Sequence, residues 1–189
     1  MLFNQLPTFI MAHIKLTNEE LPGIIGLLNH RPETAKPLLD LAETLLRGPS
    51  SLTSGEREII AASVSYWNDC HFCHTSHAAA AAAHLNLGLP LIDDIKAGLP
   101  ETPISAKMRA LLNIAHQVQR GGKNVSLDDV DAARNQGATD DEIHDTVLIA
   151  AAFCMYNRYV DGLGTWAPQA NEDYIKMGER MAHVGYGKF

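Results

Sequence analysis

Two cysteines and three histidines stand together in residues 70–77, and Glu58 precedes the first cysteine by twelve positions. Thiols, a carboxylate and an imidazole are the groups that thiol redox chemistry uses as nucleophile, second sulfur and proton relay. If this segment is helical, Cys70, Cys73 and His77 share one face of the helix. Side chains three apart on a helix have Cβ atoms about 5 to 6 Å apart, so little adjustment separates a dithiol from a disulfide. The pattern predicts a CxxC pair that opens and closes.

The position of the first thiol predicts its reactivity. Asn68 and Asp69 form an expected N-cap, which places Cys70 in the first turn of a helix. Free amide groups and partial positive charge at a helix N-terminus favour a thiolate, so the thiols are expected to be more acidic than free cysteine. Glu58 and His77 complete a proton relay if the helix before Asn68 folds back against the helix after it.

Metal binding is an alternative use of these side chains, because two thiolates, an imidazole and a carboxylate could supply four zinc ligands. Structural zinc sites more often take two ligand pairs from separate knuckles, whereas three of these ligands would come from one helix. The spacing alone leaves both interpretations open, and the redox interpretation, with no metal and no cofactor, is the favoured one. His71 and His74 are further candidate ligands or bases, but they are expected to be solvated.

The residues around the CxxC pair resemble the carboxymuconolactone decarboxylase superfamily, and within it the alkylhydroperoxidase D-like, peroxidase-related proteins. In that family a glutamate stands twelve positions before the first cysteine of a CxxCxxxH run, as Glu58 does here. The likeness extends over roughly residues 20–165, and the segments that carry it besides the motif are 47–49, 55–58, 64–70 and 157–162.

The resemblance implies an all-α fold, a single-domain helical bundle of the alkylhydroperoxidase D-like type over residues 1–189, with residues 1–17 as an N-terminal extension. It implies a peroxidase cycle in which Cys73 attacks a hydroperoxide and becomes a sulfenic acid, which Cys70 resolves as a disulfide. Glu58 and His77 form the proton relay, and a lipoyl-type or other dithiol reductant regenerates the thiols. Members of the family form oligomers, so a homo-oligomer is expected.

One position departs from the family pattern. Alkylhydroperoxidase D itself has a histidine two residues after the first cysteine, where Phe72 stands here. On a helix His71 lies about 100° from Cys70 and Phe72 about 200°, so His71 does not take over the missing place.

Two other functions remain as alternatives. Lactone decarboxylation, a lyase activity, is suggested by the superfamily name, but decarboxylating relatives do not depend on a CxxC pair. A non-catalytic helical oligomer with a structural metal or a regulatory disulfide is the other alternative.

Composition limits the class of protein. The chain has 189 residues with 46% hydrophobic content, enough for one substantial core and one domain. Its net charge is −7 without a basic cluster, which argues against nucleic acid as a partner. No apolar run approaches the roughly 18 residues of a membrane span, and the start lacks the basic flank of a signal peptide. The expected compartment is the cytoplasm, where the third cysteine, Cys154, would be an inert buried thiol.

Helix signals run through most of the chain, and no alternating β pattern competes with them. Thr17, Thr53 and Thr139 each stand three residues before a glutamate, in the form of capping boxes. Pro32, Pro90 and Pro103 suit first-turn positions. The predicted helices are 19–29, 32–47, 54–67, 69–86, 90–97, 103–120, 127–136 and 140–161. The stretch before Thr17 is apolar and is expected to pack on the bundle or on a neighbouring subunit.

Overall fold

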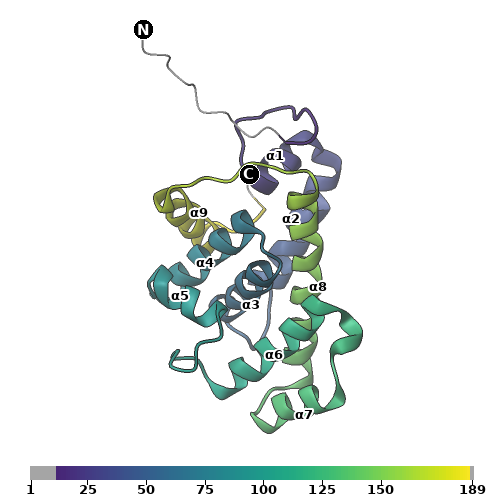
Figure 1. Cartoon of the computed structure of the whole chain (residues 1–189), viewed down its shortest axis with the longest axis vertical. Coiled ribbons are helices and arrows are strands. Elements are labelled where there is room, and N and C mark those ends of the chain that lie inside the picture. Colours follow the sequence, from purple (N-terminus) through teal and green to yellow (C-terminus); the bar gives the residue numbers. More distant parts are fainter. Residues whose placement is uncertain (1–11, 188–189) are drawn as a thin grey trace.

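The computed structural model describes residues 12–187, and within them the chain forms nine α-helices and one short 3₁₀ helix without any strand (Figure 1). The all-α prediction is confirmed. The elements are α1 (Gly23–His30), α2 (Pro32–Arg47), α3 (Ser54–Trp67), α4 (His71–Leu85), α5 (Leu89–Lys96), α6 (Ala106–Arg120), η1 (Gly122–Asn124), α7 (Leu127–Asn135), α8 (Asp140–Gly162) and α9 (Asn171–His183). Of the apolar stretch before Thr17, residues 1–11 lie outside the described part. Leu16 is described, is 6% exposed and packs in a hydrophobic cluster with Cys70 and Cys73.

Two of the three predicted capping boxes form. The Thr53 hydroxyl accepts the N–H of Glu56, whose carboxylate accepts the N–H of Thr53 in return. Thr139 starts α8 in the same way. The box predicted at Thr17 is wrong: its backbone N–H donates to the ring of His30, and α1 begins only after Pro22. Reciprocal caps satisfy two of the free amide groups at a helix start, which explains the well-defined ends of α3 and α8.

The start of α6 also differs from its prediction. Pro103 lies outside the helix, and Ser105 is the N-cap, its hydroxyl accepting the N–H of Met108. A serine side chain can accept from the third residue of the helix, whereas proline has no such acceptor and can only fit the first turn.

Helix α3 lies in the centre of the molecule, with α4, α6 and α8 packed around it (Figure 1). Five of its residues form the middle of the main hydrophobic core and are 0 to 2% exposed: Ile59, Ile60, Ala61, Ala62 and Val64. Within residues 12–187, none of the helices combines the length and the apolar character that a membrane crossing needs.

Helix α9 follows the last predicted helix and packs along α4 (Figure 1). Its Gly178 lies against the alanine run of α4, so closely that an added Cβ would come within 2.4 Å of the carbonyl carbon of Ala79. Small side chains on both helices allow this approach. Ala78 to Ala81 are buried, so this run packs in the interior of the molecule.

Candidate functional site

The CxxC segment lies where α3 turns back into α4. Asn68 ends α3, and Asp69 adopts a left-handed conformation with φ of +59°, which aspartate tolerates better than most residues. Cys70 is the N-cap of α4: its N–H donates to the carbonyl of Ser65 at 3.0 Å, and its carbonyl accepts the N–H of His74 at 3.0 Å. The predicted N-cap at Asn68 and Asp69 is therefore wrong, because the left-handed Asp69 cannot begin a helix. The helix starts one residue after Cys70.

A buried polar network holds this turn. Asn157 of α8 is fully buried; its amide donates to the Ser65 hydroxyl at 3.0 Å, and its carbonyl oxygen accepts the Asn68 amide at 2.8 Å. Gln119 of α6 donates to the side-chain oxygen of Asn68 at 3.0 Å. Asn157 therefore ties α8 to the turn that carries Cys70.

The two thiols are free and buried, with Cys70 0% and Cys73 4% exposed. A hydrogen bond with Cys73, together with burial, raises the pKa of the Cys70 thiol far above its ordinary value. The expectation of an acidic first thiol is therefore wrong. Cys73 stands at the third position of α4, within the turn where helix amides and partial positive charge favour an anion. The two sulfurs thus have different environments.

Glu58 and His77 are in contact, as expected if α3 folds back on α4. The Glu58 carboxylate is fully buried, and its Oε2 lies 2.8 Å from the Nδ1 of His77. The other oxygen, Oε1, accepts the hydroxyl of Tyr186 at 2.5 Å. Burial, followed by the nearby Glu58 charge, raises the pKa of Tyr186 well above its ordinary value, so the phenol keeps the proton that it donates.

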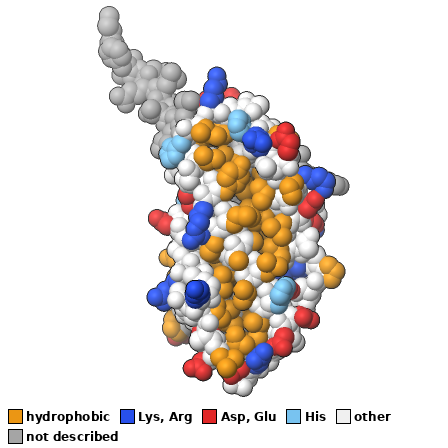
Figure 2. All heavy atoms as spheres, turned by 90° about the vertical axis from the view of Figure 1, so that its right-hand side faces the viewer, with side chains coloured by type: hydrophobic (Ala, Val, Ile, Leu, Met, Phe, Trp, Pro, Cys, Tyr) orange, Lys and Arg blue, Asp and Glu red, His pale blue; other side chains and the backbone are white. Residues whose placement is uncertain are grey.

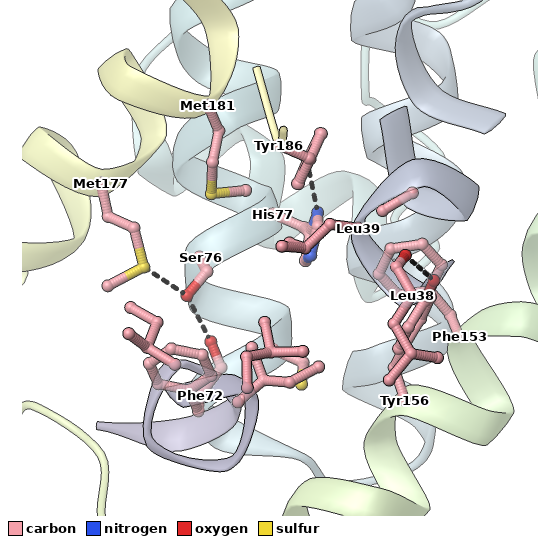
Figure 3. Close-up of a pocket in the computed structure, with 15 residues that line it drawn as sticks. Leu38, Leu39, Phe72, Ser76, His77, Phe153, Tyr156, Met177, Met181 and Tyr186 are labelled. Carbon is pink, nitrogen blue, oxygen red and sulfur yellow. Dashed lines mark hydrogen bonds between the residues drawn. The ribbon is translucent and has the colours of Figure 1, made fainter. Parts of the chain in front are cut away.

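A small apolar pocket of about 60 Å³ lies beside one of the two thiols and the imidazole of this pair (Figure 3). Cys73 and His77 both line it, whereas Cys70 does not. Figure 3 shows Met177 and Met181 pointing into the pocket from α9, with His77 and Tyr186 on another side. The rest of the wall is almost entirely hydrophobic and consists of Ile24, Ile25, Leu28, Leu38, Leu39, Ala42, Phe72, Ser76, Phe153 and Tyr156. Phe72 therefore serves as a wall residue.

Sequence reasoning missed two tyrosines near the thiols. Tyr186 follows α9, and Tyr174 lies within it, 1% exposed in the same hydrophobic cluster as Cys70 and Cys73. The Tyr174 hydroxyl has no hydrogen-bond partner. Burial and the two neighbouring thiols raise its pKa. No motif marks either residue, because α9 carries no side-chain cap at Ala170 and lies far along the chain from the CxxC segment.

Asp161 of α8 also lies beside the dithiol. Burial raises the pKa of its carboxyl, and a hydrogen bond with the Cys70 thiol acts in the opposite direction. Asp161 therefore contacts the first cysteine of the pair.

His71 and His74 differ in their surroundings. His71 is exposed, as expected. His74 is half-buried, and its Nδ1 lies 3.1 Å from the ammonium group of Lys96, which is itself 1% exposed and paired with Asp93 at 2.6 Å. Burial and then the Lys96 charge lower the pKa of His74 to about 4. The expectation of a solvated His74 is wrong, because α5 covers this side of α4.

Cys154 is half-buried and lies 3.6 Å from the amide of Asn68, as a weak acceptor. Among the residues that the structure describes, no group of three or more His, Cys, Asp or Glu side chains is arranged to hold a metal ion.

The fold and the site together define a helical protein with a buried CxxC pair beside a glutamate–histidine pair. Residues 32–85, which contain all four of these groups, match the model of the carboxymuconolactone decarboxylase family. The family resemblance seen in the motif is confirmed. Among curated proteins, the comparison found no match.

Solved structures show the same fold. An uncharacterized peroxidase-related protein from Ralstonia eutropha JMP134, described as an alkylhydroperoxidase AhpD core, is 23% identical with a TM-score of 0.77, over 89% of this chain and 97% of that chain. An uncharacterized peroxidase-related protein from Silicibacter sp. TM1040 is 25% identical with a TM-score of 0.72, over 82% and 78%. A protein of unknown function from Agrobacterium tumefaciens is 21% identical with a TM-score of 0.67, over 78% and 99%. The chain therefore has the helical fold of AhpD-like proteins.

Proposed function

We propose that the protein is a thiol-dependent peroxidase that reduces hydroperoxides through a Cys70–Cys73 dithiol/disulfide cycle. The observation that carries the proposal is one pocket lined by both Cys73 and His77, with His77 bound at 2.8 Å to the buried carboxylate of Glu58. A nucleophile and a proton carrier that face the same small space can act on one bound molecule.

The first step oxidises Cys73. The Cys73 thiol passes its proton to Nε2 of His77, and the thiolate then attacks the outer oxygen of the hydroperoxide. The O–O bond breaks, and the alkoxide leaving group takes that proton from His77. The products are an alcohol and a sulfenic acid on Cys73. Glu58 holds the ring through Nδ1, so Nε2 is the nitrogen that exchanges the proton.

The second step forms the disulfide. The sulfur of Cys70, after losing its proton, attacks the sulfenic sulfur, and the hydroxyl group leaves as water. Two electrons pass in total from the dithiol to the hydroperoxide. The raised pKa of Cys70 and its absence from the pocket wall suit the resolving role. An external dithiol, of lipoyl type or another kind, then reduces the disulfide by thiol–disulfide exchange.

A peroxidase assay with cumene hydroperoxide and dihydrolipoamide tests this cycle. Cys73→Ser is expected to abolish peroxide loss, and Cys70→Ser to allow only one turnover, leaving a sulfenic acid that dimedone traps. Cys154→Ser is the matched control and should keep full activity. Peroxide consumption that survives Cys73→Ser would remove the proposal.

The same variants separate the alternatives. Decarboxylation of a carboxymuconolactone that is unaffected by either cysteine substitution would favour the lyase. Stoichiometric zinc in protein purified without chelator, lost on alkylation of the thiols, would favour the structural metal. For location we propose the cytoplasm, because a free CxxC dithiol persists in a reducing compartment.

We also propose a homo-oligomer. Figure 2 shows hydrophobic side chains gathered along one face of the molecule, over α8 and its neighbour α2. Exposed hydrophobic side chains on these two helices include Leu148 and Met155 of α8, which are 40% and 43% exposed, and Leu41 of α2, which is 36% exposed. Met155 follows Leu148 by seven positions, the repeat with which one helix packs against another copy of itself. Light scattering should report a smaller assembly for Leu148→Glu, whereas Ile175→Glu on the distant α9 should leave it unchanged.

A further inference from the structure

The Glu58 carboxylate has one partner for each oxygen, and the two partners come from different parts of the chain. His77 of α4 binds Oε2 at 2.8 Å, and the Tyr186 hydroxyl, from the segment after α9, donates to Oε1 at 2.5 Å. Because Glu58 is fully buried, no water can replace a missing donor without opening the core. The orientation of the carboxylate therefore depends on Tyr186 as much as on His77.

Tyr186 also contacts the imidazole directly. Its hydroxyl oxygen lies 3.4 Å from Nδ1 of His77, and the two rings are stacked with an interplanar angle of 13° and centroids 6.0 Å apart. Because the hydroxyl donates its hydrogen to Glu58, the tyrosine oxygen and Oε2 of Glu58 both face Nδ1 of His77 as acceptors. Each of them requires a hydrogen on that nitrogen. This arrangement favours the tautomer with Nδ1 protonated and Nε2 free.

The backbone around Tyr186 is held by an ion pair of α2. Glu43 accepts the N–H of Tyr186 at 2.7 Å through Oε2 and pairs with Arg47 at 3.2 Å through Oε1. Arg47 in turn donates to the carbonyl of Met181 in α9 at 3.2 Å. Gly185 has φ of +90°, and a Cβ there would lie 2.5 Å from Oε2 of Glu43, so this approach needs glycine. The segment is thus built to hold one tyrosine in one place.

We propose that Tyr186 is a positioning residue of the proton relay: its hydroxyl fixes the Glu58 carboxylate and, through it, the His77 tautomer that faces the pocket. This inference rests on the proposed peroxidase function for its kinetic consequence only. The hydrogen-bonded arrangement itself can be measured without any turnover.

Tyr186→Phe tests the proposal, because it keeps the stacked ring and removes only the hydroxyl. We expect a fall in kcat of about tenfold, the effect of losing one hydrogen bond to a charged group, with KM for cumene hydroperoxide changed less than twofold. The donor stabilises the carboxylate most when His77 is uncharged. Without the Tyr186 hydroxyl, the acid limb of the pH–rate profile should therefore move to higher pH, by about half to one unit.

Nitrogen NMR of the His77 ring gives the readout that a merely structural role would not change. The unaltered protein should show Nδ1 protonated, and Tyr186→Phe should show a mixture of tautomers. Tyr156→Phe is the matched control, since Tyr156 lines the same pocket but donates to the carbonyl of Leu38 at 2.8 Å. It should leave both the tautomer and the acid limb unchanged. If Tyr186→Phe folds poorly, Glu43→Ala frees the same segment and should change both readouts in the same direction.

The outcomes separate the two proposals. An active enzyme whose kcat, acid limb and tautomer are unchanged by Tyr186→Phe would overturn the positioning role and leave the peroxidase intact. A protein without peroxidase activity whose tautomer still becomes mixed in Tyr186→Phe would remove the peroxidase and support the positioning role.

Discussion

The contact between α9 and α4 gives a sharp prediction, because a single methyl group decides it. Gly178 faces the backbone of Ala79, and a Cβ added there would lie 2.4 Å from its carbonyl carbon and 2.6 Å from its Cβ. Neither atom can rotate away, unlike the end of a flexible side chain. Gly178→Ala should therefore force α9 away from α4 by roughly 1 Å, the difference between 2.4 Å and an ordinary contact of at least 3.4 Å.

Two opposing effects set the magnitude. Overpacking of this kind costs about 1 to 3 kcal/mol. Replacing glycine by alanine inside a helix returns about 1 kcal/mol through the lower entropy of the unfolded chain. The free energy of unfolding should fall by about 0 to 2 kcal/mol, which lowers Tm by up to roughly 8 °C in a chain of this size.

Urea unfolding followed by circular dichroism measures this difference directly. Gly162→Ala is the matched control, since Gly162 ends α8 and a Cβ there would meet nothing within 4 Å. It should leave stability unchanged or raise it by up to about 1 kcal/mol. If Gly178→Ala proves as stable as Gly162→Ala, the close approach of α9 to α4 is wrong, and so is the pocket wall that depends on it.

Three further predictions concern buried polar groups. His74 has a pKa of about 4 in the fold, below its ordinary 6.5, so the unfolded chain takes up the proton first as the pH falls. The free energy of unfolding should drop between about pH 6.5 and 4 by at most about 3 kcal/mol, and screening by solvent reduces this figure. Unfolding curves of His74→Gln over the same pH range should show a smaller drop. Tyr174→Phe removes a hydroxyl without a partner and should keep or raise Tm, whereas Tyr156→Phe should cost about 1 kcal/mol. Asn157→Ala should lower the free energy of unfolding in urea by about 2 to 3 kcal/mol, because it leaves polar groups at the CxxC turn unpaired. A change below about 0.5 kcal/mol, as at ordinary surface positions, would contradict the network.

Local signals predicted the middle of the fold well. The helices expected at 32–47 and 54–67 have these bounds in the structure, since Pro32 and the capping box of Thr53 are strong start signals. The helix expected from residue 69 begins at His71, because the left-handed backbone of Asp69 is set by the turn and not by a propensity. Helix α9 could not be predicted from caps, as its N-cap residue makes no side-chain hydrogen bond.

In the candidate site too, contacts between neighbouring helices could be predicted from the sequence, whereas contacts between distant parts of the chain could not. The contact between Glu58 and His77 followed from two antiparallel helices joined by a short turn, so spacing within one hairpin was enough. Tyr186 meets Glu58 across 128 positions of chain, and only the packing of α9 on α4 brings them together. Spacing within a motif cannot predict a contact of that kind.

The difference between the two thiols arises from packing rather than from the motif. Cys70 and Cys73 belong to one CxxC run, and both were expected to gain acidity from the same helix end. Cys70 instead caps the helix from outside the pocket, between the Cys73 thiol and the Asp161 carboxyl, where a proton is retained. Cys73 lies one turn further, and α9 completes the apolar wall that it shares with His77. The motif supplies two sulfurs, and the later part of the chain determines which of them lines the pocket.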